Sequence, residues 1–131
     1  MKDIGTRDDL VILLKDFYGK AINDILIGHF FTEVIPLDLE KHVPIITDFW
    51  ETILLNGRSY TKNAVLPHMH INQLSAMEKK HFDRWLLLFT ESVDNHFQGE
   101  IAETAKQRAL SIATIIQIRI SKSPTVNFQN K

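Results

Sequence analysis

Apolar residues recur every three or four positions along most of this chain, and that spacing favours helices throughout. Residues at these intervals share one face of an α-helix, where they can be buried together. The chain carries no internal repeat and no convincing hairpin signal, so the sequence predicts an all-α protein. The four apolar stripes are Leu10, Leu13, Leu14, Phe17 and Ala21; Ile45, Ile46, Phe49, Trp50, Ile53 and Leu54; Phe82, Trp85, Leu86, Phe89, Val93 and Phe97; and Ile101, Ala105, Ala109, Ile112 and Ile116.

Residues with special backbone preferences mark where the first two of these helices begin and end. Thr6 stands just before the acidic residues Asp8 and Asp9 and is a good N-cap for the first helix. Pro44 would be costly inside a helix but is tolerated in a first turn, so the second helix is expected to begin near Lys41 to Val43. The pair Asn56-Gly57 is suited to left-handed backbone and ends that helix.

Two further helices are expected over 75–97 and 100–121, separated by Gly99. The tail, 122–131, contains a proline and polar residues and is expected to fray. A chain of 131 residues is long enough to bury a core without disulfides or structural zinc. We therefore expect one domain over 1–131.

The composition and charge exclude several kinds of function. The formal net charge is −1 and no block of Lys or Arg is present, so the sequence offers no basic surface for nucleic acid or for an anionic membrane. No apolar run approaches the roughly 18 residues of a membrane span, and the N-terminus has no signal-peptide core. The absence of cysteine excludes disulfides, thiolate–zinc sites and cysteine-ligated iron–sulfur clusters. We expect a soluble, cytoplasmic protein.

The segment 57–76 is long and aperiodic for a compact helical protein, and it contains His68 and His70. We expect a loop there, with one short helix around His68. Such a segment is either disordered or wrapped around something, so a bound cofactor is a sensible hypothesis. The histidine pair is itself a weak metal signal, because two histidines one residue apart point in different directions unless the backbone is extended. The chain has neither the H-E-x-x-H motif of zinc enzymes nor the Glu-x-x-His pairs of di-iron bundles.

Haem would require less than a zinc or di-iron site: one histidine as axial ligand, a large apolar pocket, and a distal side that decides what the iron does. Tyr18 and His42 are polar residues that adjoin apolar stripes and are candidates for that distal side. Both also have simpler interpretations, a core tyrosine bonded to a backbone carbonyl and a helix-start histidine that faces solvent. The many aromatic residues could equally form an ordinary core. His29, His81 and His96 are expected at the surface.

Nucleophilic catalysis and phosphate binding have little support in the sequence. There is no G-x-S-x-G elbow, no cysteine nucleophile and no G-x-G-x-x-G loop among the five glycines.

Five segments, taken in order along 8–116, resemble the group III truncated haemoglobins of bacteria. Two of them are specific individually, the H-V-P-I-I-T-D-F-W run at 42–50 and the H-F-D-R-W-L-L-L-F run at 81–89. The R-A-L-S-I-A run at 108–113 is also similar to the last-helix motif of the family. The other three segments are F-Y at 17–18, G-H-F-F at 28–31 and H-M-H at 68–70.

The resemblance implies a globin-like fold, a shortened two-over-two helical sandwich around haem b. It implies His68, rather than His70, as the proximal ligand of the iron. On the distal side it implies Tyr18, His42 and Trp85, whose hydroxyl, imidazole and indole groups could hydrogen-bond a dioxygen ligand. Phe31 would pack on the haem. The other expected contacts are Ile46 on the distal side, Phe49, Trp50 and Tyr60 around the cofactor, and Arg58, Lys62 and Tyr60 near the propionates.

The function that follows from the resemblance is binding of dioxygen and other diatomic ligands. A polar distal pocket favours slow release, so redox or peroxide chemistry with an unknown reductase is expected rather than bulk oxygen carriage. Two alternatives stay open at this point. The chain could be a haem-free, globin-like sensor or interaction domain, or it could be a non-haem metal hydrolase.

Overall fold

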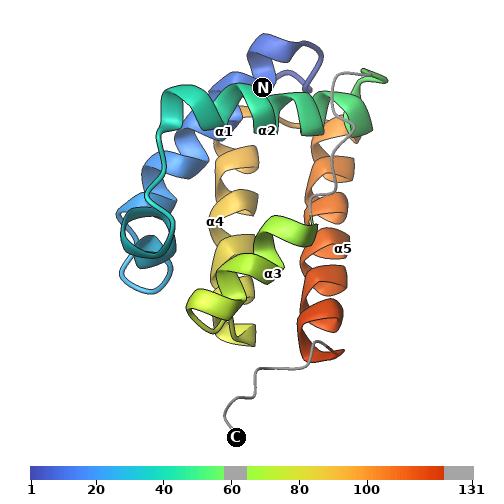
Figure 1. The fold of residues 1–131 in the computed structure, drawn as a ribbon. Helices are drawn as coiled ribbons and strands as arrows, with labels where there is room; N and C mark the ends of the chain where they lie inside the picture. The colour runs from blue at the N-terminus through green and yellow to red at the C-terminus, as the bar shows by residue number, and fades with distance from the viewer. Residues whose placement is uncertain (58–64, 123–131) are drawn as a thin grey trace, which may run out of the picture.

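The protein is described by a computed structural model that covers residues 1–57 and 65–122 (Figure 1). These residues form helices and a π-helical turn and contain no strand, which confirms the predicted all-α class. No helix among them is long and apolar enough to cross a membrane. The elements in order are α1 (Arg7–Ile22), the π-helical turn η1 (Phe30–Val34), α2 (Leu39–Leu54), α3 (Val65–Leu74), α4 (Lys79–His96) and α5 (Glu100–Lys122).

The long helices pack as two pairs, one laid over the other. α1 packs on α2, α4 packs on α5, and α1 crosses α4, so the core forms where the two pairs meet. In Figure 1, α4 and α5 run side by side, α2 crosses near the upper end of α5, and the short α3 lies in front of α4 and α5. This is the two-over-two arrangement that the sequence predicted.

The start of α1 shows the predicted cap. The Thr6 hydroxyl accepts a hydrogen bond from the backbone N–H of Asp9 at 3.2 Å. The Asp9 carboxylate in turn accepts from the N–H groups of Gly5 and Thr6 at 2.8 and 3.1 Å. This reciprocal pattern fixes the first turn, and the apolar stripe behind it is buried in the core. The expected stripe and the expected cap are both confirmed.

The prediction for the start of α2 was wrong by two residues or more, because Asp38 caps the helix earlier. The Asp38 side chain accepts from the N–H of Glu40 at 3.1 Å, and its carbonyl accepts from the N–H of His42 at 2.9 Å. Pro44 therefore lies inside α2, where it forfeits one helical hydrogen bond to the carbonyl of Glu40. The other end is as predicted, since Asn56 has a φ of 61° just after α2.

The short helix expected around His68 is present as the ten-residue helix α3. Pro67 stands in its first turn, where a proline is tolerated. Two residues apart on a helix, His68 and His70 lie on different faces: His68 is half-buried and His70 is exposed. α3 also contacts α5 and η1, so tertiary packing supports a helix that its weak periodicity did not show.

The first residues of the chain fasten the corner between α4 and α5. The Asp3 carboxylate accepts hydrogen bonds from the backbone N–H groups of Ile101 and Ala102 at 2.9 and 2.8 Å, in the first turn of α5. The Lys2 carbonyl accepts one from the N–H of Gln98 at 2.9 Å. Asp3 thus satisfies N–H groups that the start of a helix leaves without partners.

Candidate functional site

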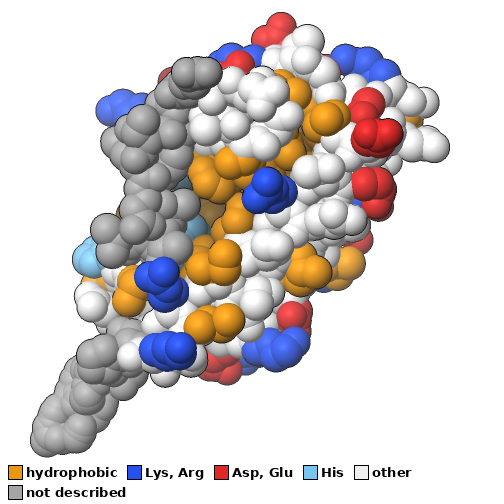
Figure 2. Space-filling model, turned by 90° about the vertical axis from the view of Figure 1, so that its right-hand side faces the viewer, with side chains coloured by type: hydrophobic (Ala, Val, Ile, Leu, Met, Phe, Trp, Pro, Cys, Tyr) orange, Lys and Arg blue, Asp and Glu red, His pale blue; other side chains and the backbone are white. Residues whose placement is uncertain are grey.

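A cavity of about 200 Å³ lies between the two helix pairs, and every helix of the described chain contributes to its wall. Figure 2 shows the side of the molecule that carries α5, where apolar side chains gather around a recess. The wall is mostly apolar and aromatic, and its polar groups are few. The aromatic lining residues are Phe17, Tyr18, Phe30, Phe31, Phe49, Trp50, Phe82, Trp85 and Phe89.

The predicted distal residues Tyr18 and His42 meet at this cavity. α1 carries Tyr18 and α2 carries His42, and the tyrosine hydroxyl and His42 Nε2 are hydrogen-bonded at 2.9 Å. Their rings meet edge to face, with centroids 5.1 Å apart. Neither simpler interpretation holds: the hydroxyl bonds to an imidazole rather than to a backbone carbonyl, and the histidine is half-buried rather than solvent-facing.

Burial sets the protonation of this pair. It raises the pKa of Tyr18 far above the ordinary value, so the hydroxyl keeps its proton. Burial also lowers the pKa of His42, and the nearby charge of His68 lowers it further. At neutral pH the pair is therefore an uncharged hydroxyl bonded to an uncharged imidazole.

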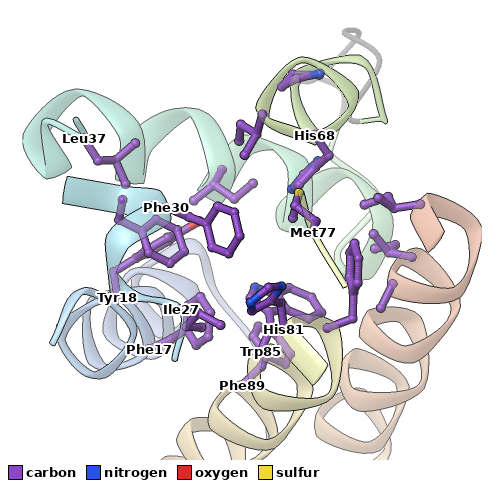
Figure 3. A pocket seen from close by; sticks show the side chains of 18 of the residues that line it. Phe17, Tyr18, Ile27, Phe30, Leu37, His68, Met77, His81, Trp85 and Phe89 are labelled. Atoms are coloured by element: carbon purple, nitrogen blue, oxygen red, sulfur yellow. The ribbon is translucent and has the colours of Figure 1, made fainter. Parts of the chain in front are cut away.

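His68 belongs to the same cavity and His70 does not. His68 lines the wall from α3, and in Figure 3 its side chain reaches into the pocket from a wall other than the one that carries Tyr18. His68 and His42 both line this cavity, and the charge of His68 is close enough to lower the pKa of His42. His70 is exposed and is not part of the lining. The structure thus separates the two histidines, with His68 alone inside.

Every predicted site residue that the structure describes lines this cavity. Trp85 packs against Phe17 with ring centroids 5.9 Å apart, and it stacks on Phe89 at 5.6 Å. Tyr60, Arg58 and Lys62 lie outside the described residues. The predicted site residues that line the cavity are Tyr18, Phe31, His42, Ile46, Phe49, Trp50, His68 and Trp85.

The prediction for His81 was wrong, because this histidine is buried and lines the cavity. Its Nδ1 accepts a hydrogen bond from the backbone N–H of Glu78 at 2.8 Å, which caps α4. Burial lowers the pKa of His81, and the charge of Lys80 adds to that effect. A sequence signal was available: His81 stands one helical turn before Trp85 and two before Phe89, on the same stripe. His96, by contrast, is exposed as predicted.

Chemically, the cavity can hold an apolar group and offer it a small number of polar contacts. The described residues contain no group of three histidine or carboxylate side chains that could hold a bare metal ion. A cofactor that brings its own metal ligands requires only one imidazole from the protein.

No family model matches the chain. The chain is 28% identical over 119 residues to the protein named group 3 truncated hemoglobin ctb of Campylobacter jejuni, a match that spans 88% of this chain and 91% of that protein. Its structure is similar to the crystal structure of group III truncated hemoglobin from Campylobacter jejuni, with a TM-score of 0.80 and 27% identity. That likeness covers 93% of this chain and 97% of the other. The resemblance to the group III truncated haemoglobins is thereby confirmed, in sequence along most of the chain and in the fold that its helices adopt.

Proposed function

We propose that this chain binds haem b in the cavity, with His68 as the axial ligand, and that diatomic ligands such as dioxygen bind beside Tyr18 and His42. One observation carries the proposal. A single imidazole enters an apolar cavity from α3, and a buried tyrosine–histidine pair lines another part of the same wall.

The residues present fit a haem. Apolar and aromatic side chains suit a flat, hydrophobic macrocycle, and a neutral imidazole is the common proximal ligand of its iron. Haem supplies the iron at which diatomic ligands bind. The names of the similar haemoglobins support the same cofactor for this chain.

On the distal side, the protein's part is to offer hydrogen-bond donors. If His42 carries its proton on Nε2, it donates to the Tyr18 oxygen and leaves the tyrosine proton for a ligand in the cavity. The Trp85 indole N–H is a further donor on the α4 wall. Such donors favour polar ligands and slow their release.

Slow release suits chemistry on the ligand better than bulk carriage. We therefore extend the proposal to redox or peroxide chemistry on the bound ligand, for which a reductase would be the partner. We also propose that the protein acts in the cytoplasm. Arg58, Lys62 and Tyr60 remain our predicted partners for the propionates.

The absorption spectrum of the purified protein, reconstituted with haem, tests the proposal. We expect a Soret band whose position reports histidine ligation. The His68→Ala variant should lose haem or its axial histidine, which is read from the same spectrum and from haem content. The His70→Ala variant is the matched control, since it changes a histidine on the same helix outside the cavity, and it should keep the wild-type spectrum.

Two results would contradict parts of the proposal. A wild-type protein without a Soret band would favour the haem-free sensor or interaction domain. A His70→Ala variant that loses the spectrum while His68→Ala keeps it would move the axial ligand to His70.

A further inference from the structure

His81 presents a polar atom to the cavity that the proposed function does not use. The residue is 8% exposed and lines the cavity from the first turn of α4. Figure 3 shows it among the side chains that surround the pocket, beside Trp85. Its nearest rings are Phe30, with centroids 5.0 Å apart, and His29, at 6.0 Å.

The cap at the start of α4 fixes the position of the proton on the His81 ring. Nδ1 accepts from the backbone N–H of Glu78 at 2.8 Å, so Nδ1 carries a lone pair and no proton. A neutral imidazole then holds its proton on Nε2. This tautomer rules His81 out as a metal ligand through Nε2 and makes Nε2–H a hydrogen-bond donor.

The donor has no acceptor among the residues that the structure describes. Within the described residues, the hydrogen bond of the His81 ring is the one that Nδ1 accepts from Glu78. Nε2 is not one of the fully buried side-chain atoms that lack a hydrogen-bond partner. Nε2–H is therefore accessible rather than sealed, and the cavity residues Phe30, whose ring lies against His81, and Phe82, next in the chain, offer it no acceptor. An accessible donor in a mostly apolar wall is available to an acceptor on whatever group enters the cavity.

We propose that His81 donates a hydrogen bond from Nε2–H to an oxygen acceptor of the group that occupies the cavity. The inference rests on the proposed function, in which that group is haem with its ligand. The acceptor is either a carboxylate of the haem or an oxygen-bearing diatomic ligand. His81 is then a binding residue as well as a helix cap.

Three substitutions separate the donor role from the cap. His81→Gln keeps an acceptor for the Glu78 N–H and a donor for the cavity. His81→Glu keeps the acceptor, as glutamate does in an ordinary capping box, but its carboxylate has no proton to donate. His81→Leu removes both. The comparison between Glu and Gln carries the test, so it survives if the Leu variant fails to fold.

Each variant is loaded with haem, and two quantities are measured. The first is the rate of haem transfer to an excess of a haem-free acceptor protein. The second is the C–O stretching frequency of the carbon monoxide complex. If the acceptor is a haem carboxylate, His81→Glu should lose haem severalfold faster than His81→Gln, with an unchanged stretch. If the acceptor is the diatomic ligand, the stretch should shift in His81→Glu and not in His81→Gln.

A His81→Glu variant that matches His81→Gln in both measurements would overturn the inference and leave His81 as a cap alone. That failure is distinct from failure of the proposed function, because the latter shows as a wild-type protein that takes up no haem. A purely structural role would also lower the melting temperature of His81→Leu while leaving Glu and Gln alike.

Discussion

At the scale of single residues, the Tyr18 hydroxyl is the group whose environment most restricts its chemistry. It is buried, its pKa is raised far above the ordinary value, and its hydrogen-bond partner is His42. A hydroxyl that cannot ionise at physiological pH can serve a bound ligand only as a neutral donor or acceptor.

We expect Tyr18→Phe to speed dioxygen dissociation by about ten- to hundredfold, because a buried bond of this kind contributes about 1.5–3 kcal/mol. Stopped-flow measurement of the off-rate checks this. Ile46→Val is the control, since it trims the same cavity wall without removing a donor. An off-rate that is no faster in Tyr18→Phe than in the control would remove Tyr18 from ligand binding.

At this scale, the surroundings of a residue could be predicted only where its neighbours along the chain also surround it in space. Tyr18 and His42 could be picked out as polar residues beside apolar stripes, although nothing local showed that they touch. His81 was missed because its neighbours Lys79, Lys80 and Asp83 are exposed, which makes its surroundings in the sequence polar. In space, however, the Phe30 ring from η1 lies against His81, with ring centroids 5.0 Å apart.

At the scale of elements, the turn between α4 and α5 is the most demanding. Gly99 has a φ of +147°, a backbone conformation that residues with a side chain rarely adopt, and a Cβ there would collide with the Asp3 side chain. The same glycine allows Asp3 to approach the first turn of α5 closely.

We expect Gly99→Ala to lower the free energy of unfolding by about 1–3 kcal/mol, from backbone strain and the displaced Asp3. Gly19→Ala is the matched control. Gly19 lies within α1, where a Cβ would meet nothing within 4 Å, so alanine should raise the free energy of unfolding by about 0.5–1 kcal/mol. Urea titrations of both variants measure the difference. Equal effects of the two substitutions would show that the turn is not strained by a side chain.

The elements also show what the sequence could predict. α1 was predicted correctly because its cap and its stripe agree, whereas α2 was not, because Pro44 suggested a later start than the Asp38 cap allows. α3 was expected only as a short helix within a long loop, because its ten residues have little amphipathic pattern. Its helical form depends on contacts with α5 and η1, which are far away in sequence.

At the scale of the whole molecule, three carboxylates fasten the fold and each has a lowered pKa: Asp3 and Asp24 join segments far apart in sequence, and Asp9 fixes the start of α1. Burial alone would raise the pKa of Asp3, Asp9 and Asp24, but hydrogen bonds outweigh it. Asp3 accepts from backbone N–H groups, Asp9 from Lys2 and the α1 cap, and Asp24 from Arg84 and two backbone N–H groups.

Because these pKa values are lower in the folded state, the unfolded chain binds more protons as the pH falls. The stabilisation is complete well above the ordinary pKa of 3.8 and is lost as the pH falls through the folded-state values. We expect the free energy of unfolding to fall steeply below about pH 4. Urea unfolding between pH 7 and pH 3 measures it.

Asp3→Ala isolates one of the three carboxylates. At pH 7 it should lower the free energy of unfolding by about 1 kcal/mol, as loss of a helix cap does. The gap to the wild type should narrow as the pH falls below about 4, because the unfolded wild-type chain then gains a proton that the folded Asp3 carboxylate resists. A gap that stays constant with pH would mean that the charge of Asp3 does not stabilise the fold.

The bonds from Asp3 to the first turn of α5 also bear on the order in which the molecule folds. They join residues 98 and 99 positions apart, so nearly the whole chain must be arranged before they can form. Contacts that close so long a loop are costly in entropy and are expected after the helix pairs have met. Asp3→Ala should therefore speed unfolding and leave the refolding rate almost unchanged, because the contacts of Asp3 form after the transition state for folding.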